Sequence, residues 1–98
     1  MKIKASEFEK EVVGAKGKVI VDFYAEWCPP CKRLAPLLEE LENEGKVKVC
    51  KVDVDEEGAL AMQFGVTNIP LLVLFKEGKA LRSSLGYKTK AELVEFIG

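Results

Sequence analysis

The segment VIVDFYAEWCPPC, residues 19–31, joins an apolar run to a pair of cysteines. Its first six residues are apolar except for Asp22, which is the pattern of a strand buried on both faces of a sheet. Leucines at positions 34, 37, 38 and 41 then recur at helical spacing, up to a glycine at position 45. This segment therefore predicts a buried strand, a cysteine-containing junction and a helix, which Pro36 is expected to kink.

The rest of the chain alternates between strand and helix patterns. We expect a short strand near Ile3, a helix opened by Ser6–Glu9, a strand over 47–54, a short helix capped by Asp55, a strand over 71–75, a hairpin at 76–79 with a strand through Leu85, and a final helix opened by Thr89–Glu92. This order predicts a single α/β domain, residues 1–98, with a mainly parallel sheet covered on both faces and an antiparallel hairpin at one edge.

Composition excludes several classes of function. The 98 residues carry 15 basic and 16 acidic side chains, a net charge of −1, so the strong positive charge of a nucleic-acid or membrane-surface binder is absent. No apolar stretch approaches the ~18 residues of a membrane span, and no apolar signal segment opens the chain, so we expect a cytoplasmic protein. There is no histidine, which excludes Ser-His and Cys-His catalytic pairs and histidine metal ligands.

Cys28 and Cys31 have the spacing that places two side chains on one face of a first helical turn, ~5–6 Å apart. A small adjustment satisfies disulfide geometry, and a helix N-terminus favours a thiolate, which is the nucleophilic form of the thiol. Redox chemistry is therefore the leading interpretation. Metal binding and inert packing remain as alternatives, although zinc requires four ligands and only Cys50 is left as another soft donor.

Motifs spread over nearly the whole chain resemble the thioredoxin family. They are Val21–Cys28, Pro30–Lys32, Ala35-Pro36, Lys51–Asp55, Phe64–Val66, Ile69-Pro70, Phe75–Gly78 and Gly86. The resemblance implies a thioredoxin fold, with a five-stranded mixed sheet of order 1-3-2-4-5 flanked by four helices. It also implies reduction of protein disulfides by a monomer without a cofactor, with disulfide-containing client proteins and a thioredoxin reductase or equivalent electron donor as partners.

The resemblance also implies the roles of four residues. Cys28 attacks the client disulfide, and Cys31 resolves the mixed disulfide. We expect the Cys28 sulfur, nearer the mouth of the helix, to be the better exposed of the two. Burial should raise the pKa of Asp22, while Lys51 on a neighbouring strand opposes that shift, so that Asp22 accepts a proton from Cys31 during resolution. The alternative for Asp22 is a structural carboxylate bonded to backbone amides.

The client is expected to dock beside the cysteines. Only ~5–6% of X–Pro bonds are cis, so the residues alone predict a trans Ile69-Pro70 bond, whereas the resemblance implies a cis bond there. The docking surface implied by the resemblance comprises Trp27, Pro29, Pro30, Asn68, Ile69, Pro70 and Gly86. Peptide pairing with exposed backbone at this surface would give affinity with little sequence preference.

Three positions need separate interpretation. Pro29 stands where thioredoxins most often have glycine, and because a residue before proline disfavours helical backbone, we expect regular helix to begin at Pro30 or later. Leu71 replaces a threonine usual after the cis proline. Cys50, among valines in a strand, is expected to be an inert buried thiol, and the alternative is a regulatory or dimer-forming cysteine, which would require surface exposure. The alternative function is a thioredoxin-fold binding module in which the cysteine pair is not used.

Overall fold

The apolar run that begins the quoted segment forms a central strand of the sheet. The computed structural model describes residues 1–98, and its sheet has the order β2-β1-β3-β4. The strands are β1 (Lys18–Tyr24), β2 (Lys48–Asp53), β3 (Leu71–Lys76) and β4 (Lys79–Leu85). β1 pairs parallel with β2 and antiparallel with β3, and β3 pairs antiparallel with β4. The mixed sheet and the antiparallel hairpin at one edge are confirmed, but the expectation of a mainly parallel sheet is wrong, because β3 runs antiparallel to the central strand β1.

The expectation of five strands is wrong. The segment near Ile3 forms only an isolated parallel bridge between Lys2 and Lys51, on the β2 edge where the resemblance places the first strand. The amide of Ile3 donates to the Lys51 carbonyl at 2.9 Å, and the chain then turns away because the Lys4 amide donates to the Glu7 carboxylate at 2.8 Å. The turn leaves too few extended residues for a fifth strand.

Helical turns connect the N-terminal bridge to β1. A 3-10 turn, η1 (Ala5–Glu7), precedes a short π-helix, η2 (Glu9–Val13). The predicted capping box at Ser6–Glu9 is wrong, because the Lys4 and Glu7 pair occupies that role nearer the start of the chain. The N-terminal segment is nevertheless helical, as predicted, and Gly14 follows its last turn.

Three α-helices follow the strands: α1 (Pro29–Asn43), α2 (Gly58–Gln63) and α3 (Lys90–Ile97). α1 begins one residue before the earliest predicted position, because the fixed φ of Pro29 suits a first helical residue and its missing N–H is not needed there. Asp55 is not the cap of α2, since Glu57 occupies that position. The predicted cap of α3 is confirmed, with the Glu92 amide donating to the Thr89 hydroxyl at 3.2 Å. No helix has the length and hydropathy needed to span a membrane.

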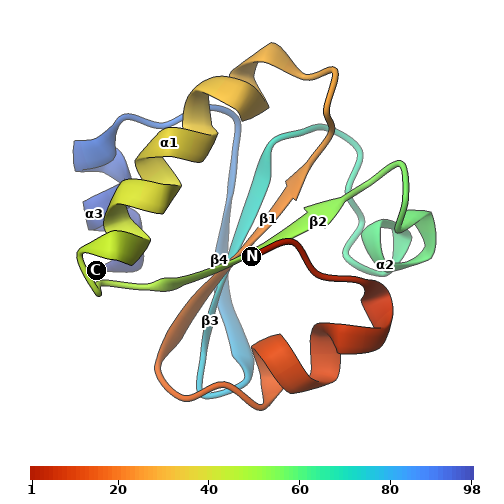
Figure 1. The fold of residues 1–98 in the computed structure, drawn as a ribbon, viewed down its shortest axis with the longest axis horizontal. Coiled ribbons are helices and arrows are strands. Elements are labelled where there is room, and N and C mark those ends of the chain that lie inside the picture. The colour runs from red at the N-terminus through yellow and green to blue at the C-terminus, as the bar shows by residue number, and fades with distance from the viewer.

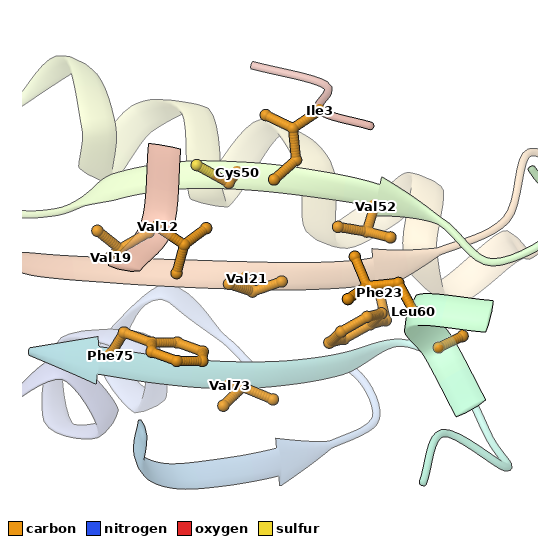
Figure 2. Packing of buried hydrophobic residues seen from close by; sticks show 11 residues of the cluster. Ile3, Val12, Val19, Val21, Phe23, Cys50, Val52, Leu60, Val73 and Phe75 are labelled. Carbon is orange, nitrogen blue, oxygen red and sulfur yellow. The ribbon is translucent and has the colours of Figure 1, made fainter. Parts of the chain in front are cut away.

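The helices lie on both faces of the sheet, as expected for this class (Figure 1). α1 and α3 cover one face, and α2 with the N-terminal turns covers the other. β1 supplies both apolar layers, because its successive side chains alternate between the faces. Figure 2 shows the layer under α2, in which Val21 and Phe23 of β1 pack with Leu60 and Phe75. Two buried layers hold the end of β1 and the start of α1 in place, and that junction carries the cysteines.

Candidate active site

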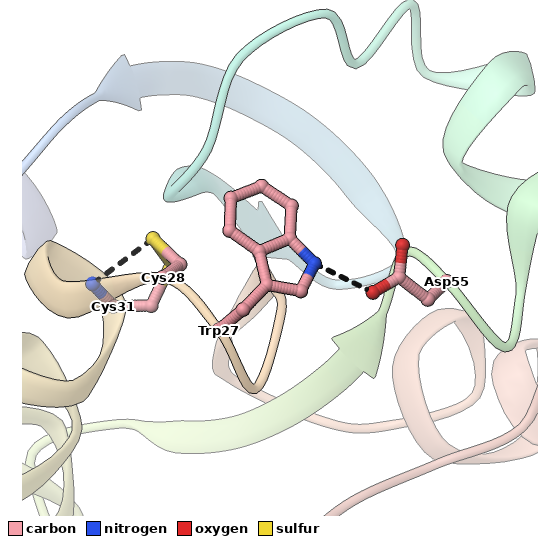
Figure 3. Close-up of a disulfide and its surroundings, with 4 residues drawn as sticks. All are labelled: Trp27, Cys28, Cys31 and Asp55. Carbon is pink, nitrogen blue, oxygen red and sulfur yellow. Dashed lines mark hydrogen bonds between the residues drawn. A yellow bond between two sulfur atoms is a disulfide. The ribbon is translucent and has the colours of Figure 1, made fainter.

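Cys28 and Cys31 form a disulfide at the junction between β1 and α1, with 5.2 Å between their Cα atoms. Cys28 is the N-cap residue of α1, in extended conformation, and Cys31 lies in the first turn. The backbone amide of Cys31 donates to the Cys28 sulfur at 3.3 Å, as Figure 3 shows. The structure therefore brings the predicted pair together and directs a helix N-terminal N–H group at the sulfur of Cys28.

The expectation that Cys28 is better exposed than Cys31 is wrong. The two residues are 3% and 4% exposed, and both belong to a small buried cluster with Tyr24 and Ala25, against which Ile69 packs. Cys28 lies at the mouth of the helix, as its N-cap, but packs against this cluster, so that position does not expose it. Exposure therefore does not distinguish the two cysteines, whereas the hydrogen bond to the Cys28 sulfur does.

Asp22 is buried in the middle of β1 with 1% of its surface exposed, and neither of its carboxylate oxygens has a protein hydrogen-bond partner. Burial raises its pKa to about 6, and the positive charge of Lys51 opposes that rise. Both directions are those predicted from the sequence. The alternative of a carboxylate bonded to backbone amides is wrong for Asp22, and Asp53 fits that description, since it accepts the Asp55 amide at 2.9 Å.

Lys51 lies directly across from Asp22 in the β1–β2 register, as expected. The two side chains form no salt bridge. Instead, the Lys51 ammonium lies 4.3 Å from the centre of the Tyr24 ring, a cation–π contact. Burial raises the pKa of the Tyr24 phenol. Lys51 therefore acts on Asp22 through its charge at a distance and leaves the carboxylate free of a direct partner.

Asp22 and Cys31 each line a cavity. One, of about 320 Å³, is lined by Asp22 and by residues of α1 and β2. The other, of about 190 Å³, is lined by Cys31, Tyr24 and neighbours. Ala35 and Lys51 line both cavities, and the Asp22 carboxylate accepts no hydrogen bond from Cys31 or any other residue. Ala35 and Lys51 therefore lie between the cavity of Asp22 and the cavity of Cys31.

One of the predicted docking residues, Ile69, lies against the cysteine pair. The Ile69-Pro70 bond is cis, as the resemblance implies, and Ile69 packs against the cysteine cluster. The Gly86 amide donates to the Pro70 carbonyl at 2.8 Å, which fixes the end of β4 beside this loop. The amide and carbonyl of Ile69 take part in no backbone hydrogen bond. Asn68 and Pro29 are exposed and Pro30 is half-buried.

Trp27 is 67% exposed, as expected of a contact residue, and its indole N–H donates to the Asp55 carboxylate at 2.8 Å. Figure 3 shows the indole nitrogen directed at Asp55 and away from the cysteine pair. This role of Asp55 was missed, because the sequence places it in a predicted helix cap. The available signal was that Asp55 follows β2, whose carboxyl end meets that of the parallel strand β1 at one sheet edge.

Cys50 is buried in the apolar layer under α2, as expected of an inert thiol. Burial raises its pKa, and its sulfur lies 3.9 Å from the Glu11 carbonyl. The cluster that contains Cys50 does not contain Cys28 or Cys31. The chain has no group of three or more acidic, cysteine or histidine side chains placed to hold a metal ion.

Comparisons with known proteins agree with this geometry. The family model described as Thioredoxin matches residues 1–98. The chain is 43% identical to a thioredoxin of Pseudomonas aeruginosa, over 94% of this chain and 87% of that protein. It is 41% identical to a thioredoxin of Bacillus subtilis, over 97% of this chain and 93% of that protein. It is 45% identical to thioredoxin C-2 of Corynebacterium nephridii, over 92% of this chain and 85% of that protein.

These relatives and the cysteine pair at disulfide distance make the protein a thiol–disulfide oxidoreductase that acts on protein disulfides. The family implies disulfide substrates and a reductase as electron donor. The fold, with its mixed sheet between helices and its cysteines where β1 meets α1, leads to the same conclusion. The chain belongs to the thioredoxin family.

Proposed function

We propose that the protein reduces client disulfides with Cys28 as the attacking sulfur and Cys31 as the resolving one. One observation carries this order: the amide of Cys31 donates to the sulfur of Cys28 at the N-terminus of the 15-residue helix α1. A hydrogen-bond donor and the positive end of a helix dipole both stabilise a thiolate over a thiol. Only the thiolate attacks a disulfide, so the stabilised sulfur is the nucleophile.

The reaction has two exchange steps. The Cys28 thiolate attacks one client sulfur, a mixed disulfide forms, and the other client sulfur leaves as a thiolate that takes a proton. Cys31 then loses its proton and attacks Cys28, which releases the second client sulfur as a thiolate that is also protonated. The protein thereby loses two electrons and two protons as its dithiol becomes a disulfide, and the client gains both.

We infer that Asp22 accepts the Cys31 proton in the second step. A carboxylate with a pKa of about 6 is mostly ionised near neutral pH and is a stronger base than an ordinary aspartate. The proton would cross from the Cys31 cavity to the Asp22 cavity past Ala35 and Lys51. Lys51 has a supporting role, because its positive charge lowers the pKa of Asp22 against the effect of burial and so favours the ionised carboxylate.

Clients are proposed to dock over the cis Ile69-Pro70 loop. The free amide and carbonyl of Ile69 offer one donor and one acceptor to an extended peptide, which gives affinity without side-chain readout. The remaining contacts would come from the exposed Trp27, Pro29 and Asn68, from the half-buried Pro30 and Gly86, and from the edge of the buried Pro70. The proposal also includes a monomer, working in the cytoplasm, where a separate reductase keeps the pair reduced.

The order of attack is tested with Cys28→Ser, Cys31→Ser and the double variant, each incubated with a disulfide-bonded peptide and analysed by mass spectrometry. Cys31→Ser should accumulate a mixed disulfide at Cys28, because resolution is blocked, and the other two variants should accumulate none. All three should lose insulin reduction driven by dithiothreitol. An active Cys28→Ser variant would instead support the binding-module alternative, and a peptide adduct at Cys31 in Cys28→Ser would reverse the proposed order.

A further inference from the structure

Arg33 and Tyr87 form a contact at one side of the proposed docking surface. The Arg33 guanidinium carbon lies 5.6 Å from the centre of the Tyr87 ring, close enough for a cation–π interaction. Arg33 lies on α1, two residues after Cys31. Tyr87 follows Gly86, whose amide is bonded to the Pro70 carbonyl. The contact therefore joins the helix of the active site to the segment that flanks the cis proline.

Arg33 is exposed and forms no salt bridge, and Tyr87 is 43% exposed. Lys32 and Lys88, which adjoin this pair in sequence, also form no salt bridge. The side of the site that carries Trp27 is different, because an acidic residue, Asp55, lies there and is bonded to the indole. Unpaired positive charge therefore lies at the Arg33 side of the docking surface, in addition to Lys51, which lies over Tyr24 beside the Cys31 cavity.

We propose that Arg33, held over Tyr87, is a specificity-determining residue that favours client segments carrying an acidic side chain near the reactive disulfide. This inference rests on the proposed function. A client strand over the cis-proline loop runs between the two sides of the site, so a carboxylate on one flank of its disulfide meets the guanidinium. Stacking on Tyr87 restricts the guanidinium in advance, which lowers the entropy lost when the ion pair with the client forms.

The alternative is that the contact between Arg33 and Tyr87 is purely structural and holds α1 against the segment after β4. Loss of a structural contact would lower the free energy of unfolding, and it would change the rate of reduction of all clients equally. A charge-recognition contact would change the ratio of rates between acidic and basic clients and leave a neutral client nearly unaffected. The ratio of kcat/KM values therefore separates the two roles.

The experiment uses three sets of disulfide-bonded peptides that differ only in one residue on either flank of the reactive cysteine: Asp, Lys or Ser. The 98-residue protein is tested on each peptide, and kcat/KM is measured for wild type, Arg33→Glu and Arg33→Lys. Lys16→Glu is the matched control, because it makes the same change in net charge at an exposed residue before β1, at the end of that strand opposite the cysteines.

Wild type and Arg33→Lys should prefer the Asp peptide over the Lys peptide by about two- to fivefold on one flank, the range of exposed ion pairs. The preference should shrink in 0.5 M salt, and Arg33→Glu should reverse it. The inference is overturned if wild type shows no preference, if Arg33→Glu keeps it, or if Lys16→Glu changes it equally. If the wild-type protein fails to reduce even the Ser peptides, the proposed function is overturned. If it reduces the Ser peptides normally but reduces the Asp and Lys peptides equally well, only the role of Arg33 is overturned.

Discussion

Replacing Asp22 by Asn should stabilise the protein in a strongly pH-dependent way. The folded-state pKa of Asp22 is about 6, raised from an ordinary 3.8 by burial. The unfolded chain therefore ionises this group first, and the folded state is destabilised as pH rises between about 4 and 6. A shift of roughly two units at ~1.4 kcal/mol each makes the cost about 3 kcal/mol above pH 7. The asparagine side chain carries no charge and is nearly isosteric with aspartate, so the variant removes this cost.

The assay is urea unfolding of the oxidised wild type and Asp22→Asn at several pH values from 4 to 8.5. The variant should gain about 3 kcal/mol of unfolding free energy at pH 8 and well under 1 kcal/mol at pH 4. Asp53→Asn is the control, because Asp53 is also buried but accepts backbone amides, and it should show no such gain at pH 8. The reasoning is refuted if the difference between wild type and Asp22→Asn is the same at pH 4 and pH 8.

Two further predictions concern a pair of glycines at the end of the sheet opposite the cysteines and the hydrogen bond of Trp27. Gly78 and Gly17 have nearly the same backbone angle, with φ of +79° and +78°. A Cβ atom added at Gly78 would lie 2.6 Å from the backbone carbonyl oxygen of Val13, whereas one added at Gly17 would have no atom within 4 Å. Gly17→Ala should cost about 1–2 kcal/mol and Gly78→Ala at least twice as much in urea unfolding, and equal losses would contradict the steric argument. Asp55→Ala should lower the fluorescence anisotropy of Trp27, the only tryptophan, because its indole loses the hydrogen bond. Glu56→Ala, which removes only a surface ion pair, should leave the anisotropy unchanged, and an unchanged Asp55→Ala would show that the bond does not restrain the indole.

The parts of the fold that depend on apolar periodicity can be predicted from the sequence. The buried run over 19–24 and the helical leucines after the cysteines are local patterns, and each forms the expected element because burial on a given face is decided by spacing. The missing fifth strand could not be predicted in this way. It depends on whether the backbone near Ile3 turns at Lys4, and a single carboxylate contact from Glu7 decides that.

The candidate site also combines features that a local sequence pattern predicts with features that depend on contacts between distant segments. The position of the cysteine pair follows from a strand-to-helix junction that the local pattern contains, and the raised pKa of Asp22 follows from a carboxylate in an apolar strand. The partner of Trp27 and the near-equal burial of the two cysteines depend on how separate segments pack, which periodicity does not encode. Contacts between elements distant in the sequence therefore had to come from the structure.

The central claim is that two electrons pass from the Cys28 and Cys31 thiols to a client disulfide. Single turnover of the reduced protein with excess disulfide peptide, followed by acid quenching and peptide mapping, measures this most directly. The protein should lose two hydrogens per disulfide reduced, with the new bond joining Cys28 to Cys31 and Cys50 still a free thiol. Peptide reduction without that bond, or a bond that includes Cys50, would contradict the account.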